Sequence, residues 1–168
     1  MADDIVNRVA NSKLVVVDLE DYYPEGKRIL FDIKDWLFEG LVLREKAFRV
    51  QVAEHNWSQY QDAYVALICT SDAIVPAWAY MLISINLEPY AIKTLFGDLE
   101  QLEISIFQTV IENLDVTSFK DKSLIIKGCS NKPVPANAYI LMSQKLKPVA
   151  KSIMYGEACS SVPLFKKK

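Results

Sequence analysis

The sequence contains an internal repeat, and this is the feature that most limits what the chain can fold into. When the chain is aligned with itself at a spacing of 59 positions, residues 57–100 fall on residues 116–159 without a gap. The segment VPAWAYMLISINLEPYA (75–91) then matches VPANAYILMSQKLKPVA (134–150). The 44 pairs contain 13 identities, which in the first copy are Asp62, Ser71, Val75, Pro76, Ala77, Ala79, Tyr80, Leu82, Ser84, Leu87, Pro89, Ala91 and Gly97. We interpret the pattern as an internal duplication, with too few copies for a solenoid.

Each copy predicts the same series of elements. An apolar run at 64–70 predicts a strand buried on both faces, and a helix over 76–87 follows between two prolines. A second strand is expected at 91–97, and the second copy repeats the series at 123–128, 135–146 and 151–156. Between the copies, Asp98 and Gln101 form a capping box for a helix over 99–114. This alternation predicts an α/β fold with a largely parallel sheet built from two duplicated βαβ units.

The segment before the repeats has a different pattern. Residues 13–23 and 28–38 are rich in β-branched and aromatic residues, and the PEGK sequence at 24–27 is typical of a turn. We therefore predict an N-terminal antiparallel hairpin over 13–38, followed by a helix within 41–55. The expected organisation is one α/β domain over 1–168, with the hairpin at 13–38, repeat one at 57–100 and repeat two at 116–159.

Composition excludes several classes of protein. The chain has 168 residues, of which 51% are hydrophobic and 24% charged, as in a globular domain with a sizeable core. The net charge is −2 and no basic face stands out, so we expect no binding to nucleic acid. The N-terminus lacks a signal peptide, and the apolar runs are shorter than the ~20 residues that span a bilayer, so we expect a cytoplasmic protein without membrane contact. A duplicated α/β domain can also form a homodimer, for which aromatic side chains such as Trp36, Trp57 and Trp78 would supply the interface.

The cysteines mark the candidate site. Three cysteines are an odd number without a secretion signal, which favours reduced thiols or metal ligands. Cys129 and Cys159 each follow a predicted strand of the second copy, and ligands of parallel sheets bind beyond the carboxyl ends of strands. These two thiolates are the predicted metal ligands, with zinc as the first choice and iron as the second. Further ligands expected on the same edge are Glu157, Asp72 and Cys69.

Two alternatives remain open. The thiols of Cys129 and Cys159 could react without a metal, because thiols near a helix N-terminus can have a lowered pKa. The chain could instead be a non-enzymatic binding or dimerisation module in which the cysteines are structural. The lone His55 is expected at the opposite edge of the sheet, which argues against a zinc site of three cysteines and one histidine. Glycine-rich nucleotide loops and the common hydrolase motifs are absent from the sequence.

Several segments resemble an uncharacterised family of Bacteroidetes proteins that is described as a domain of unknown function. The resemblance lies in FDIKDWLFEGLVLREKAFR, WSQYQDAYVALICTSDAIVPAWAYML, KGCSNKPVPANAYILM and SIMYGEACSSVPLF. It extends over nearly the whole chain from the predicted hairpin onward. The family implies no catalytic residues. Its GCS and GE-x-CS motifs match Gly128–Ser130 and Gly156–Ser160, which supports treating the two cysteines as a pair, although Ala158 stands where the family pattern suggests proline.

Overall fold

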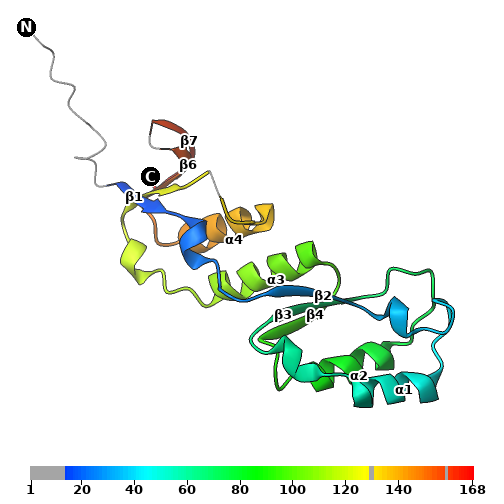
Figure 1. Cartoon of the computed structure of the whole chain (residues 1–168). Helices are drawn as coiled ribbons and strands as arrows, with labels where there is room; N and C mark the ends of the chain where they lie inside the picture. The colour runs from blue at the N-terminus through cyan, green and yellow to red at the C-terminus, as the bar shows by residue number, and fades with distance from the viewer. Residues whose placement is uncertain (1–13, 129–130, 158) are drawn as a thin grey trace, which may run out of the picture. The chain divides into compact units, whose positions relative to one another are not determined.

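The chain divides into two compact units. A computed structural model describes residues 14–128, 131–157 and 159–168 (Figure 1). Unit 2 is continuous and spans Glu25–Leu102, whereas unit 1 combines the chain up to Pro24 with Glu103–Lys168. Unit 2 is thus inserted in the sequence of unit 1. The described residues form a mixed α/β fold with four α-helices and two sheets.

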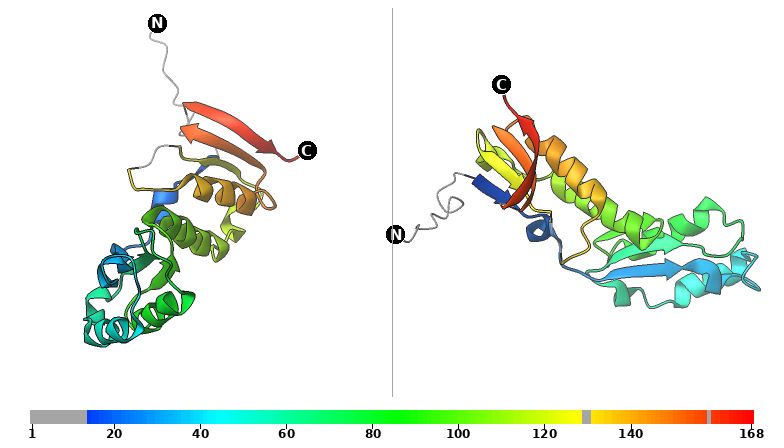
Figure 2. Two further views of the ribbon diagram at one scale, coloured as in Figure 1. Left: turned by 90° about the vertical axis from the view of Figure 1, so that its right-hand side faces the viewer. Right: turned by 90° about the horizontal axis from the view of Figure 1, so that it is seen from above.

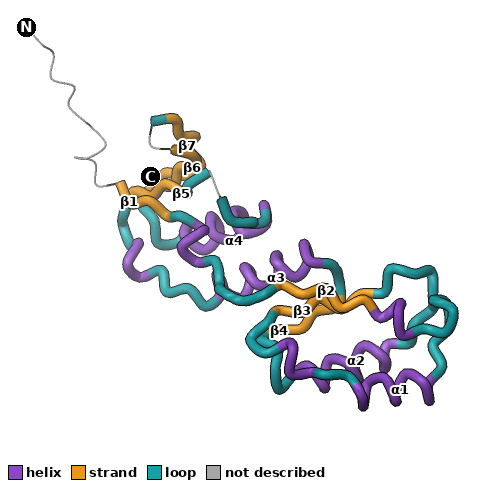
Figure 3. Tube along the Cα trace, viewed as in Figure 1, coloured by secondary structure: helices purple, strands orange, loops and turns teal. Residues whose placement is uncertain are grey.

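Unit 2 is a three-stranded parallel sheet with two helices. The strands β2 (Arg28–Asp32), β3 (Tyr64–Ile68) and β4 (Lys93–Phe96) lie side by side in that order. Helix α1 (Glu45–Glu54) connects β2 to β3, and α2 (Ala77–Leu87) connects β3 to β4. The strands lie in the order in which they occur along the chain, and right-handed crossovers then place both connecting helices on one face of the sheet. Helices α1 and α2 accordingly cover the same face of the unit 2 sheet (Figure 3). Their buried side chains share one core with Val65 and Leu67 of β3.

Unit 1 has a four-stranded sheet in the order β1-β5-β6-β7. The strands β1 (Leu14–Val17), β5 (Ser123–Ile126) and β6 (Ser152–Glu157) are parallel, and β7 (Ser160–Lys166) pairs antiparallel with β6 (Figure 2). Helices α3 (Leu99–Glu112) and α4 (Ala136–Leu146) contribute Phe107, Ile111 and Met142 to its core. At the start of α3, the capping box predicted from Asp98 and Gln101 is confirmed by both reciprocal hydrogen bonds.

Equivalent backbone hydrogen bonds occur within each unit, at positions that are 59 residues apart in the two repeats. Asp62 N–H donates to Tyr90 O, and Asp121 N–H donates to Val149 O. Both aspartates have a positive φ, 57° and 55°. The short 3-10 helices η3 (Trp57–Tyr60) and η4 (Thr117–Phe119) lie before the equivalent strands β3 and β5. Repeat one and repeat two thus build the same strand-entry geometry in different sheets.

The predicted antiparallel hairpin over 13–38 is wrong. β1 and β2 belong to different sheets, where β1 pairs parallel with β5 and β2 pairs parallel with β3. Each strand ends early because an aspartate caps a 3-10 helix: Asp18 accepts from Glu20 N–H before η1 (Leu19–Tyr22), and Asp32 accepts from Lys34 N–H before η2 (Ile33–Trp36). The turn at 24–27 therefore links the two units, and the single predicted sheet is two sheets.

An aromatic cluster fills part of the core of unit 2. Phe31 contacts the rings of Trp36, Trp57 and Tyr60, and the imidazole of His55 lies among the same rings. His55 Nε2 lies 2.9 Å from the Tyr60 hydroxyl. Burial lowers the pKa of His55 below its ordinary value of 6.5, because the surroundings disfavour the imidazolium. The neutral ring is therefore the form that the fold accommodates.

This environment predicts a pH-dependent stability of unit 2. The pKa of His55 is lower in the folded chain than in the unfolded chain, where it is about 6.5. Above pH 6.5 the neutral ring therefore makes its full contribution to the stability of the fold. That contribution is lost as the pH falls from 6.5 to the pKa of the folded chain, because the unfolded chain then binds a proton more readily. We expect the urea midpoint, followed by tryptophan fluorescence, to fall between pH 7.5 and pH 5 by more in the wild type than in His55→Gln. An equal fall in both chains would contradict this role of His55.

Candidate functional site

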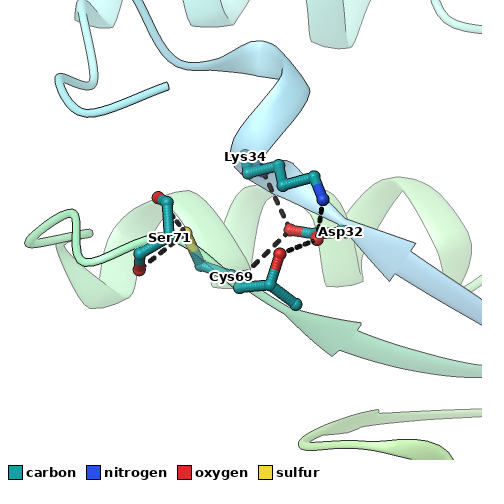
Figure 4. A network of polar contacts seen from close by, with 5 residues as sticks. Asp32, Lys34, Cys69 and Ser71 are labelled. Carbon is teal, nitrogen blue, oxygen red and sulfur yellow. Dashed lines mark hydrogen bonds and ion pairs between the residues drawn. The ribbon is translucent and has the colours of Figure 1, made fainter. Parts of the chain in front are cut away.

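A polar network lies at the carboxyl edge of the unit 2 sheet (Figure 4). Asp32, at the end of β2, accepts hydrogen bonds from the backbone N–H and the hydroxyl of Thr70, which follows β3. Lys34 Nζ lies 3.5 Å from the same carboxylate. The thiol of the half-buried Cys69 lies 3.2 Å from the Ser71 hydroxyl. We name Asp32, Lys34, Cys69, Thr70 and Ser71 the edge network.

Charge within the edge network is compensated. Partial burial raises the pKa of Asp32, but the hydrogen bonds from Thr70 and Lys34 and the Lys34 charge outweigh it, so the pKa is lowered. Burial raises the pKa of Tyr80, in the first turn of α2, and electrostatic interaction with the nearby Cys69 and Asp32 raises it further. Asp32 is thus ionised and Tyr80 protonated at neutral pH. With its carboxylate engaged by Thr70 and Lys34, Asp32 holds the loop after β3 in place.

An apolar hollow of about 630 Å³ continues the same edge. The hairpin at Phe38–Val42, which turns at Glu39 and Gly40 with positive φ, forms one wall. Its lining consists of Leu41, Val42, Leu43, Asp72, Ala73, Ile74 and Pro76. Asp72 is the one charged residue of this lining, so the hollow is suited to an apolar group.

The carboxyl edge of unit 1 repeats part of this arrangement. Asp18, at the end of β1, forms a 2.7 Å ion pair with Lys127, which follows β5. Burial raises the pKa of Asp18, but the hydrogen bond from Lys127 and the backbone bond from Glu20 outweigh this and lower it. The rings of Tyr139 and Tyr155 are edge-to-face at 5.8 Å, as Tyr80 and Phe96 are at 4.8 Å in unit 2.

The described site residues that the sequence predicts belong to two different units. Cys69 and Asp72 lie at the carboxyl edge of unit 2, whereas Glu157 ends β6 and the exposed Cys159 precedes β7 in unit 1. Cys129 lies outside the described residues. Within 14–128, 131–157 and 159–168, no group of three His, Cys, Asp or Glu side chains could hold a metal ion. The zinc or iron site therefore remains a prediction from the sequence.

The hydrogen bonds of His55 do not place its imidazole as a base for Cys69. Its Nε2 lies near Tyr60 and 3.1 Å from Gln59 Nε2, while Cys69 lies with Ser71. A histidine-activated nucleophile at Cys69 therefore has no support in the geometry.

The sequence reasoning missed the outer face of α2. The alignment of the two repeats shows which residues differ between α2 and α4, but only the structure shows which of their side chains are exposed to solvent. Both α2 and α4 bury three equivalent positions, which are Ala79, Ile83 and Leu87 in one and Ala138, Met142 and Leu146 in the other. Opposite them, Met81 and Ile85 of α2 are 63% and 68% exposed. The position of Ile85 is Gln144 in α4, and no residue from 73 to 87 is charged. We name Met81 and Ile85 the α2 outer face.

Comparisons with known proteins give a family but no activity. A family model described as "Protein of unknown function (DUF2480)" matches residues 3–167. Searches of curated proteins and of solved structures found no match. In the part of the chain that the structure describes, every helix is too short or too polar to cross a membrane.

Proposed function

We propose that this chain, which belongs to the family described as a protein of unknown function (DUF2480), is a binding module that forms a homodimer through unit 2. Membership of the family assigns it no activity. The observation that carries this proposal is the apolar, exposed α2 outer face. A helix that carries no charged residue and has large apolar side chains on the side away from the core is normally covered on that side too. In the described unit, the sheet covers only one side of α2.

The comparison between α2 and α4 supports an interface rather than a requirement of the fold. The two helices share their core-facing residues, so the fold constrains those positions in the same way. The outer positions differ: Ile85 corresponds to Gln144, and Ile92, which precedes β4, corresponds to Lys151. An exposed apolar side chain at these positions is thus unnecessary for folding. Its presence in unit 2 is explained if another surface covers it.

The absence of charge on α2 favours a second copy as the partner. In a two-fold dimer each surface meets itself, so like charges would face one another across the axis. The segment 73–87 contains no charged residue and meets this requirement. Surfaces of this kind also have the apolar character of homodimer interfaces.

Substitution on the α2 outer face tests the dimer. We expect Met81→Lys to raise the dimer dissociation constant at least about 30-fold, since burying an unpaired charge at the centre of an interface costs about 2 kcal/mol or more. Ile85→Gln, which gives α2 the residue of α4, is expected to act in the same direction. Sedimentation equilibrium measures the constant, and circular dichroism checks that the variants fold.

Ile140→Lys is the matched control. Ile140 occupies the position of Met81 in repeat two and is 55% exposed, so both substitutions introduce the same charge at the same place on a helix. The proposal predicts no change of the dissociation constant for Ile140→Lys. A dimer that is indifferent to Met81→Lys, or equally sensitive to both substitutions, would exclude the α2 outer face as the interface.

We also infer that the two units descend from one duplicated βαβ unit. The 13 ungapped identities support this inference, as do the recurring hydrogen bonds of Asp62 and Asp121. On this account, the two copies have diverged at positions 85 and 92, where repeat two has Gln144 and Lys151, while the position of Met81 is apolar in both copies.

A further inference from the structure

Lysines from three segments of the chain lie together at one edge of the unit 1 sheet. Lys122 and Lys151 directly precede β5 and β6, and the antiparallel β7 brings Lys166 opposite Ser152, the first residue of β6. Backbone hydrogen bonds join the segments, because Lys151 N–H donates to Lys122 O and Lys167 N–H donates to Lys151 O. We name the exposed lysines of these segments the basic edge, which consists of Lys120, Lys122, Lys147, Lys151, Lys166 and Lys167.

The basic edge carries little compensating charge. Segments 120–122, 147–151 and 166–167 contain six lysines and one acidic residue, Asp121, which gives a net charge of +5. Asp121 lies 3.5 Å from Lys167 Nζ, and both side chains are exposed. Each segment alone contains only two lysines. The concentration of charge arises because β6 pairs with β5 on one side and with β7 on the other.

The fold does not require these lysines, because unit 2 builds the same local geometry without them. In unit 2 the backbone hydrogen bond equivalent to that of Lys151 runs from Ile92 N–H to Ala63 O. The lysines of repeat two at this edge, Lys120, Lys122, Lys147 and Lys151, correspond to Gln61, Ala63, Glu88 and Ile92. A function outside the fold therefore explains the basic edge better than a structural role does.

An apolar hollow of about 330 Å³ adjoins the basic edge. Its lining comes from α4, β6 and β7 and consists of Ser143, Gln144, Lys147, Ile153, Leu164 and Phe165. Lys147 thus belongs to both the hollow and the basic edge, and Lys166 directly follows Phe165. Among the described strands, β7 has no counterpart in the three-stranded sheet of unit 2. Both the hollow and the basic edge therefore distinguish unit 1 from unit 2.

The chemistry of this surface discriminates between classes of anionic partner. A hollow receives an apolar group from its partner, whereas a membrane-binding surface inserts its own apolar side chains into the lipid. Sites for single-stranded nucleic acid combine cations with aromatic or arginine side chains that stack on bases, and segments 120–122, 147–151 and 166–167 contain neither. Lysines are mobile point charges that can pair with carboxylates spread along an extended chain. An acidic polypeptide with one apolar side chain fits both the charge and the hollow.

We propose that the basic edge is a docking surface for an acidic segment of another protein, which places one large apolar side chain in the adjoining hollow. The lysines attract and orient the acidic segment, and the apolar side chain anchors it. This inference goes beyond the proposed dimer, since the docking surface belongs to unit 1 and the dimer interface to unit 2. Failure of either proposal leaves the other intact.

Fluorescence anisotropy with a synthetic peptide tests the docking surface. The probe is a labelled peptide of eight glutamates with one leucine at its centre, titrated with the full chain at about 0.15 M salt. Lys120→Gln/Lys147→Glu gives unit 1 the residues of unit 2 and is expected to weaken binding about 10-fold, since each exposed ion pair contributes up to about a factor of five. Circular dichroism checks that the variant folds.

Lys27→Gln/Lys46→Glu is the matched control. It changes the net charge of the chain by the same amount, but at exposed lysines of unit 2. The expected change in peptide affinity is below about twofold. An equal loss of affinity in the two double variants would show that only the overall charge matters and would overturn the docking surface.

Two further probes test the class of partner. A peptide with alanine in place of the central leucine is expected to bind at least about threefold more weakly, because it leaves the hollow empty. An oligothymidylate with the same number of negative charges is expected to bind more weakly than the leucine peptide, as are vesicles that contain phosphatidylserine. Equal affinity of the two peptides, or tighter binding of the oligonucleotide or the vesicles, overturns the proposed partner.

Discussion

Replacing Phe48 with alanine is expected to destabilise unit 2 by about 3–5 kcal/mol, the usual cost of removing a large buried aromatic side chain. Phe48 lies in α1 and is fully buried. Its ring contacts Trp36 and Trp78, each at a centroid distance of 5.7 Å. The substitution leaves a cavity between α1, α2 and the segment after β2. Because these elements form one core, the loss should be felt throughout unit 2.

Tryptophan fluorescence during urea unfolding measures this effect selectively. All three tryptophans of the chain, Trp36, Trp57 and Trp78, belong to unit 2. The control is Val50→Ala on the same helix, where the side chain is exposed and the expected change is within about 0.5 kcal/mol. A loss below about 1 kcal/mol for Phe48→Ala would show that the aromatic cluster does not organise this core.

The second large effect is expected in unit 1, where Gly156→Ala should cost at least about 2 kcal/mol. Gly156 has a φ of 118°, a conformation that residues with a Cβ rarely adopt. A Cβ at this position would also lie 2.6 Å from Ser160 O, in the backbone of the antiparallel partner β7. The added methyl group therefore pushes β6 and β7 apart. Hydrogen exchange of the β6 and β7 amides is the measurement, with faster exchange expected in the variant.

Gly40→Ala separates backbone strain from crowding. Gly40 has a φ of 69°, but no atom lies within 4 Å of its hypothetical Cβ. We expect a cost of about 1 kcal/mol for the left-handed backbone alone. If Gly156→Ala lowers the free energy of unfolding by no more than Gly40→Ala does, then the close approach of the added methyl group to β7 does not destabilise unit 1.

Much of the fold could be predicted because local patterns agree with it. The apolar run at 64–70 became β3, the prolines bound α2 and α4, and the capping box begins α3. The N-terminal hairpin failed for a definite reason. The Val-rich and Leu-rich segments continue as DLEDYY and DIKDWLF, in which an aspartate ends the strand by capping a 3-10 helix. Residue alternation alone does not distinguish such a cap from a continuing strand.

The site was harder to predict than the fold, because it depends on which sheet each strand joins. Cys69 and Glu157 both lie near the carboxyl ends of strands, but β3 and β6 belong to different sheets. The pairing partners of short parallel strands depend on contacts between residues distant in sequence, and the contacts of Asp18 with Lys127 and of Asp32 with Thr70 accompany the pairing observed here. The α2 outer face did leave a signal, which is the uncharged segment 73–87 beside its more polar equivalent.

The mass of the wild-type protein in solution tests the central claim most directly. Sedimentation equilibrium over a dilution series distinguishes a single chain of 19.1 kDa from a particle of twice that mass. The proposed interface predicts the doubled mass at high concentration and a reversible return to 19.1 kDa on dilution, with Met81→Lys displaced toward the single chain. A mass of 19.1 kDa at every concentration up to about 100 µM would contradict a dimer tight enough to explain the exposed face of α2.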